Sequence, residues 1–265
     1  MELRNSLQLR ISYQLYLLKT LPWGYIGTYR NQPAVFLTKD PNDPSVNSKN
    51  KKRYLLTREK GKLYSELVNK SQAANVEYER LMAEWKRMYK GNPTIVEFPL
   101  DNRLITGLSS EQFKIALPNQ NTKENRNPIE YKGQLLRSKN ELLGIQEIEK
   151  MGFDWKTEIN INGCLFPDAT FDVPYIGKSI MAEIDGMMED FDYCRKSVKR
   201  QFQYHVNGFR EFSDVVFYRL SDRANFDIPS FRRLIELSIE LNATFIMENQ
   251  PSVPQTVPQF CSNRT

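Results

Sequence analysis

The sequence predicts a mixed α/β protein in two parts: a basic α+β module with a long helix, and an α/β domain with helices flanking a mixed central sheet. One apolar stripe at helical spacing runs through residues 62–90, and helix-like and strand-like segments alternate through 131–247. Charge divides the chain too: residues 1–90 hold 17 Lys and Arg against 8 Asp and Glu, and the remainder holds 20 against 24. We therefore expect domains at 1–95 and 131–247.

The first module should contain a helix, a small sheet and the long helix. An amphipathic helix over residues 1–20 is expected to end at the Leu-Pro-Trp-Gly segment, because proline and glycine break the helical ladder. Short apolar runs flanked by turn residues predict three strands, at 25–30, 34–38 and 54–57. A polar connecting region is expected over 96–130.

The second part should alternate helix and strand before a flexible proline-containing tail at 248–265. Its expected helices are 136–151, 191–205 and 229–241, and its expected strands are 157–161, 168–173, 179–185 and 215–218.

Composition excludes several classes of protein and site. No apolar run approaches the roughly 20 residues that span a bilayer, so no membrane association is expected. The three cysteines are odd in number and widely spaced, which favours free thiols in a reducing cytoplasm. His205 is the only histidine, and this excludes histidine-rich metal sites. A hydrolase of this composition would rely on oxygen ligands and a hard cation.

Three acids occupy positions from which they could meet. Glu141 lies in the first turns of a predicted helix, Asp168 begins a predicted strand, and Glu183 lies in the middle of the next strand. The separation of 15 positions between the last two suits a hairpin of adjacent strands. A carboxylate triad of this type can hold Mg²⁺ or Mn²⁺ and leave coordination positions for water and phosphate.

The ordered motifs around these acids resemble the PD-(D/E)xK nuclease superfamily. They are Tyr-Lys-Gly at 131–133, Arg-Ser-Lys-x-Glu at 137–141, Phe-Pro-Asp-Ala-Thr at 166–170 and Glu-x-x-Gly-Met-Met at 183–188, followed by Tyr193 and Lys196. The similarity is to a bacterial and phage-associated branch with "YPDFT" and "WEHxGM" strands, over about residues 131–220. It implies a restriction-endonuclease-like fold and metal-dependent cleavage of nucleic acid.

The resemblance implies that Glu141, Asp168 and Glu183 are the metal-binding acids, and it has two departures. Ala182 and Ile184 occupy the positions of the branch's Trp and His, and the second departure follows two residues after Glu183. The superfamily usually carries a lysine two residues after the strand glutamate, and this chain has Asp185 there. Strand alternation puts Asp185 on the same face as Glu183, so it is a further metal-ligand candidate. The missing cation is expected from the next helix, at Lys196 or Lys199.

Structural explanations compete with the catalytic one. An acid near a helix start is favoured by the helix dipole, and lysines on a helix are by default a solvated face. Glu183 and Asp185 are the hardest to explain structurally, because two carboxylates on one face of an apolar strand require a counter-ion.

The expected activity is metal-dependent hydrolysis of nucleic acid, with DNA favoured over RNA, and the basic module is expected to hold the phosphates. Its expected contacts are Lys51, Lys52, Arg53, Lys60 and Lys62. The rival is a nucleic-acid-binding protein that keeps the nuclease fold without its chemistry, which Asp185 favours. A structural or protein-interaction module is a third alternative. The sequence predicts no oligomeric state.

Overall fold

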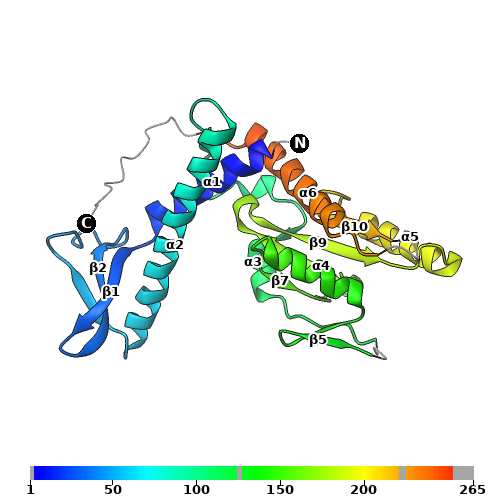
Figure 1. Cartoon of the computed structure of the whole chain (residues 1–265), viewed down its shortest axis with the longest axis horizontal. Helices are drawn as coiled ribbons and strands as arrows, with labels where there is room; N and C mark the ends of the chain where they lie inside the picture. Colours follow the sequence, from blue (N-terminus) through cyan, green and yellow to red (C-terminus); the bar gives the residue numbers. More distant parts are fainter. Residues whose placement is uncertain (1–2, 124–126, 221–224, 253–265) are drawn as a thin grey trace. The chain divides into compact units, whose positions relative to one another are not determined.

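A computed structural model describes residues 3–123, 127–220 and 225–252 of the chain (Figure 1). The fold is mixed α/β and divides into two compact units. The C-terminal unit comprises Leu100–Gln250 with the residues before Leu7, and the N-terminal unit comprises Leu7–Pro99 with the residues after Gln250. None of the helices in the described ranges combines the length and apolar character needed to cross a bilayer.

The N-terminal unit contains an antiparallel three-stranded sheet in the order β1-β2-β3. Arg30 and Asn31 both adopt positive φ in the tight turn between the first two strands. The elements are α1 (Arg4–Thr20), β1 (Trp23–Tyr29), β2 (Gln32–Lys39), β3 (Lys52–Leu55) and α2 (Glu59–Met88). All five expected elements of this part are therefore present, with ends shifted by a few residues.

The long helix α2 packs on one face of this sheet. Val35 and Leu37 of β2 are buried against Val68 of the helix, in a core that Tyr54 and Tyr64 also join. A second cluster unites α1 with the C-terminal half of α2, through Leu15 and Trp85 among others. The apolar stripe seen in the sequence is thus a packing surface.

The C-terminal unit is built on a sheet in the order β10-β9-β8-β7. Strand β10 runs parallel to β9, whereas β8 and β7 are antiparallel to their neighbours, so the sheet is mixed as expected. The strands are β7 (Trp155–Lys156), β8 (Ala169–Val173), β9 (Lys178–Asp185) and β10 (Val215–Arg219), with β4 (Leu108–Ser109) also pairing with β9. A separate hairpin joins β5 (Ile129–Tyr131) to β6 (Gln134–Leu136).

Helices flank this sheet, and two of them carry residues of the candidate functional site. These are α4 and α5; the helices of the described part of this unit are α3 (Ser110–Ile115), α4 (Lys139–Lys150), α5 (Phe191–Val206) and α6 (Ile228–Asn249), with the 3-10 turns η1 (Asn102–Leu104) and η2 (Pro174–Ile176). Every residue of β9 is buried, including its two acids. A strand buried on both faces places its polar side chains where they need partners inside the protein.

Two expectations from the sequence are wrong. Residues 157–161 do not form a strand: β7 ends at Lys156, and Glu158 adopts a φ of 46°, a left-handed conformation incompatible with a continuous strand. The last helix extends to Asn249 instead of ending at residue 241, because Ala243 and Ile246 continue its buried face. It thereby includes the first two residues of the expected tail, and 253–265 lie outside the described residues.

A buried ion pair ties the start of β9 to its surroundings. The Lys178 ammonium group pairs with Asp214 and lies 3.1 Å from the backbone oxygen of Ser213 and 3.3 Å from Oδ1 of Asn242 in α6. Burial lowers the pKa of Lys178, whereas the attraction of Asp214 opposes that change. The lysine therefore needs this set of acceptors to remain charged.

Substituting Lys178→Met should lower the free energy of unfolding by about 3–5 kcal/mol, because it leaves the Asp214 carboxylate buried without its cation. Urea titration followed by circular dichroism measures this change. The double substitution Lys178→Met/Asp214→Asn should recover part of the loss. A loss below about 1 kcal/mol in the single variant would contradict this account of the pair.

Candidate functional site

The three predicted acids gather at one end of the C-terminal sheet. Ala169 of β8 pairs with Ala182 of β9, so the antiparallel register places Asp168 opposite Glu183. Oδ2 of Asp168 accepts a hydrogen bond of 2.8 Å from the backbone N–H of Ile184. This bond holds Asp168 against β9 although it lies one residue before its own strand.

Glu141 reaches the same cluster from the first turn of α4. Ser138 caps this helix by accepting from the backbone N–H of Glu141, and the Glu141 carboxylate accepts from the backbone N–H of Arg137 at 2.8 Å. The first bond is an ordinary N-cap, and the second joins the carboxylate to the residue just before the cap instead of to Ser138 itself. Glu141 therefore has a structural role at the helix start as well as a place in the cluster.

Arg137 lies among three of the acids. One of its terminal nitrogens pairs with Asp168, and its Nε lies 3.7 Å from Oε1 of Glu141 and 2.9 Å from Oε1 of Glu158. Glu158 is the residue whose left-handed backbone ends β7. A non-glycine residue in this conformation is strained, and such strain is found at functional sites more often than elsewhere.

Arg200 of α5 supplies the second cation. Its Nη1 lies 2.5 Å from Oε2 of Glu183 and 3.6 Å from Oδ1 of Asp185. The Tyr204 hydroxyl donates to the other oxygen of Glu183 at 2.6 Å. The predicted shared face of Glu183 and Asp185 is thus confirmed, since one guanidinium contacts both carboxylates.

Asp185 is incompletely satisfied despite its burial. Its Oδ2 accepts from the Ser197 hydroxyl and lies 3.9 Å from Nε of Arg219, but its Oδ1 has no hydrogen-bond donor among the described residues. A buried carboxylate oxygen without a donor is costly, so this position calls for a partner.

The cluster holds more negative charge than its arginines neutralise. Burial, followed by repulsion from Asp168, raises the pKa of Glu183 to about 8, although Arg200 and Tyr204 oppose this shift. Burial and the same repulsion raise the pKa of Glu141 to about 7, with Arg137 opposing. Both groups therefore take up protons near neutral pH.

The residues fit a hard cation in chemistry but not in their present arrangement. The donors are all carboxylate oxygens, the ligands that Mg²⁺ prefers. Within the described ranges, however, no three Asp, Glu, His or Cys side chains are grouped to hold a metal ion. The reason is visible in the contacts above: guanidinium groups lie between the carboxylates. A metal would bind here only if Arg137 or Arg200 turned away.

Lys196 and Lys199 are exposed on α5, and the structure brings Arg200 to the acids from this helix. The residues of α5 that face β9 are Ser197, Arg200 and Tyr204, which follow one another at steps of three and four. This face begins one residue after the face predicted from Lys196 and Lys199. No sequence pattern singled out this face, because the large apolar residues of α5, Phe191, Val198, Phe202 and Val206, are exposed. Arg137 could have been found from its spacing of four from Glu141.

The five basic residues predicted to contact nucleic acid belong to the N-terminal unit. Lys51 and Arg53 lie beside aromatic rings on one face of the small sheet. Lys52 alternates to the other face and pairs with Asp43. Lys60 lies over the rings of Tyr54 and Tyr64, and Lys62 is exposed on α2.

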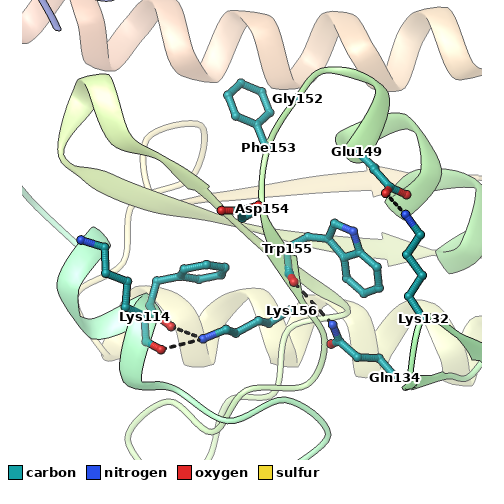
Figure 2. Close-up of a pocket in the computed structure, with 10 residues that line it drawn as sticks. Lys114, Lys132, Gln134, Glu149, Gly152, Phe153, Asp154, Trp155 and Lys156 are labelled. Atoms are coloured by element: carbon teal, nitrogen blue, oxygen red, sulfur yellow. Dashed lines mark hydrogen bonds and ion pairs between the residues drawn. The ribbon is translucent and has the colours of Figure 1, made fainter. Parts of the chain in front are cut away.

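A cavity of about 660 Å³ borders the edge strand β7 and does not contain the acid cluster. Figure 2 shows its three lysines, with dashed contacts for two of them: Lys132 pairs with Glu149, and Lys156 donates to the backbone oxygens of Phe113 and Lys114. Lys114, the third, pairs with Glu111 outside the drawn set. The three lysines of this cavity already have partners, so they are poorly available to bind an anion.

The free energy of unfolding should fall as the pH rises through the raised pKa values of Glu141 and Glu183. The folded pKa values of about 7 and 8 lie above the ordinary value of 4.5, so the folded state binds more protons between pH 4.5 and 8. The protonation contribution is complete below pH 4.5 and is lost as pH rises through 7 and 8. In EDTA, Glu183→Gln should make the decline shallower by up to about 1.4 kcal/mol per pH unit.

Urea titrations at pH 5, 6, 7 and 8 measure this slope for the wild type and Glu183→Gln. Glu248→Gln, at an exposed position in α6, is the matched control and should keep the wild-type slope. Parallel curves for the wild type and Glu183→Gln would show that Glu183 does not titrate in this range.

Comparisons with known proteins assign no role to the residues of this site. No protein-family model matches the chain, and neither a curated protein nor a solved structure matches it.

Proposed function

We propose that this chain is a metal-dependent phosphodiesterase acting on nucleic acid, with DNA favoured, and that its C-terminal unit has a restriction-endonuclease-like fold. The observation that carries the proposal is the buried surplus of carboxylates at one end of the sheet. Asp168 immediately precedes β8, Glu183 and Asp185 lie in the adjacent strand β9, and Glu141 lies at the start of α4. Their resemblance to the acids of the nuclease superfamily supports the same assignment.

Asp168, Glu183 and Glu141 would hold Mg²⁺ or Mn²⁺, and Asp185 has a further oxygen available for it. When bound, such an ion lowers the pKa of a coordinated water and neutralises charge that develops on the phosphate. The acids must be ionised to bind it, so the protons on Glu141 and Glu183 compete with the metal.

The arginines would hold the phosphodiester. Their side chains are 33% and 28% exposed, whereas the acids beneath them are almost fully buried. A phosphate that approaches from solvent therefore meets Arg137 and Arg200 first. A guanidinium group binds phosphate oxygens through paired hydrogen bonds, and Arg200 would supply the positive charge that the superfamily usually takes from lysine.

The second candidate is a nucleic-acid-binding protein without catalytic activity. Its specific support is that Asp168 and Glu183 already have a guanidinium partner, which is the arrangement of a structural ion-pair network. Asp185 at the expected lysine position agrees with it. This candidate predicts salt-sensitive binding of nucleic acid and no cleavage with any divalent metal.

Cleavage by the full-length chain tests the proposal. Supercoiled plasmid and circular single-stranded DNA should be cut with Mg²⁺ or Mn²⁺ and left intact with EDTA. Asp168→Asn should reduce the rate by on the order of 100-fold or more, because it removes a carboxylate ligand of the metal that would neutralise charge on the reacting phosphate. Asp192→Asn, an exposed acid in the first turn of α5, is the matched control and should cut at the wild-type rate.

The same assay decides which cation serves the reaction. Arg200→Gln should lose most of the activity, whereas the double substitution Lys196→Gln/Lys199→Gln should retain it if Arg200 is the cation. The reverse pattern would favour the lysines predicted from the sequence. Binding without cleavage by the wild type would support the second candidate, and cleavage that survives Asp168→Asn would exclude this site.

Thermal unfolding gives a readout that is independent of activity. Mg²⁺ should raise the melting temperature more at pH 8 than at pH 6, because ionisation of Glu141 and Glu183 favours metal binding. Asp168→Asn should abolish the increase. An equal increase at both pH values, or one that persists in Asp168→Asn, would place the metal elsewhere.

A further inference from the structure

The small sheet of the N-terminal unit has one face that its own helix does not cover. Side chains alternate across a strand, and Val35 and Leu37 point into the core with Val68 of α2. Phe36 lies between them in sequence and therefore points the other way. The register aligns Phe36 with Tyr25 on β1 and with Arg53 on β3, so the three share this uncovered face.

Aromatic rings form the centre of this face. The Tyr25 and Phe36 rings are stacked, with centroids 5.0 Å apart and planes within 9°. Tyr25 remains 43% exposed. Gly27 lies beside both: a Cβ there would be 3.4 Å from the Phe36 ring and 3.6 Å from the Tyr25 ring. The rings therefore lie against the sheet over Gly27, at ordinary van der Waals distance from where its side chain would begin.

Cations surround these rings. The Lys51 ammonium lies 5.3 Å from the centroid of the Tyr25 ring, and the guanidinium groups of Arg53 and Arg30 lie 3.4 Å and 5.2 Å from that of Tyr29. All three basic residues are exposed. None of the strands β1, β2 and β3 contains an acidic residue. The face is therefore positively charged as well as aromatic.

We propose that this face binds single-stranded nucleic acid, with bases stacking on the Tyr25–Phe36 pair and phosphates pairing with Lys51 and Arg53. Exposed rings flanked by cations are the combination that binds unpaired strands with little sequence preference. The bases of a duplex are stacked on one another, so a duplex would contact the cations but could not use the rings. This binding site goes beyond the proposed cleavage activity and does not require it.

The proposal separates basic residues that the sequence grouped together. Lys51 and Arg53 contribute to the binding face, whereas Lys52 points to the opposite side and is neutralised by Asp43. The rings add a contact that a purely electrostatic grip on phosphate lacks. Binding should therefore depend on Tyr25 in a way that salt does not remove.

Fluorescence anisotropy with the full chain in EDTA tests the proposal, using a labelled oligothymidylate of about 16 nucleotides. Tyr25→Leu should weaken binding about tenfold, and Tyr25→Trp should preserve it. Arg53→Gln should weaken binding and lower the slope of log affinity against log salt by about 0.7. The matched control is Lys86→Gln, at an exposed position of α2, which should bind within about twofold of the wild type.

Several results would overturn the proposal. One is wild-type affinity in both Tyr25→Leu and Arg53→Gln; another is a duplex of the same length that binds as tightly as the single strand. A third is a wild type that does not bind the oligonucleotide but self-associates in sedimentation, with association lost in Tyr25→Leu, since the face would then join two copies of the chain. Circular dichroism checks that the variants fold, and Arg53→Gln, at an exposed position, remains informative if Tyr25→Leu does not.

EDTA keeps this test independent of the proposed cleavage. Failure of the nuclease proposal would leave the anisotropy results unchanged. Loss of binding in Tyr25→Leu with metal-dependent cleavage intact would in turn leave the nuclease proposal in place.

Discussion

The C-terminal unit depends on how it compensates buried negative charge. Glu141, Glu158, Asp168, Glu183 and Asp185 are all at most 7% exposed. Arg137 and Arg200 contact all five, the closest approaches being to Asp168 and Glu183. Isolated carboxylates could not remain ionised in such a place, because burial disfavours the charged form by several kcal/mol. The fold therefore requires the two arginines and the protons that Glu141 and Glu183 take up.

Backbone geometry explains why the acids meet. The antiparallel register of β8 and β9 brings Asp168 opposite Glu183, and alternation along β9 returns Asp185 to the same face. The N-terminus of α4 adds Glu141, which its capping bonds orient. The left-handed backbone at Glu158 ends β7 beside the cluster. Each acid is positioned by a main-chain feature, whereas the compensating charges reach the cluster on the long side chains of Arg137 and Arg200.

The sequence predicts these main-chain features better than it predicts the partners. Residue period and turn chemistry indicated the long helices and the strands β1, β2, β3, β8, β9 and β10, but not the short strands β4, β5, β6 and β7. The spacing of Asp168 and Glu183 indicated their pairing. Glu158 was missed because a left-handed glutamate has no sequence signature. Arg200 was missed because helix phase was assigned from the visible lysines, and an error of one residue rotates the assigned face by about 100°. Which side chain compensates a buried acid depends on three-dimensional packing, which one sequence does not show.

The balance of charge in the cluster is the basis of the proposal that it binds a cation. A network that served stability alone would gain from matching each acid with a base, because unmatched buried charge is destabilising. Here five buried acids contact two arginines, and a third, Arg219, approaches Asp185 only to 3.9 Å. Protons make up the difference at Glu141 and Glu183, whose pKa values are raised to about 7 and 8. A divalent ion can make up the same deficit, and it would displace those protons as well as the arginines. The displaced guanidinium groups would then be available to bind a phosphate whose charge the metal neutralises. Under the proposed function, replacing the arginines by a metal on the carboxylates would therefore form both the metal site and the phosphate site.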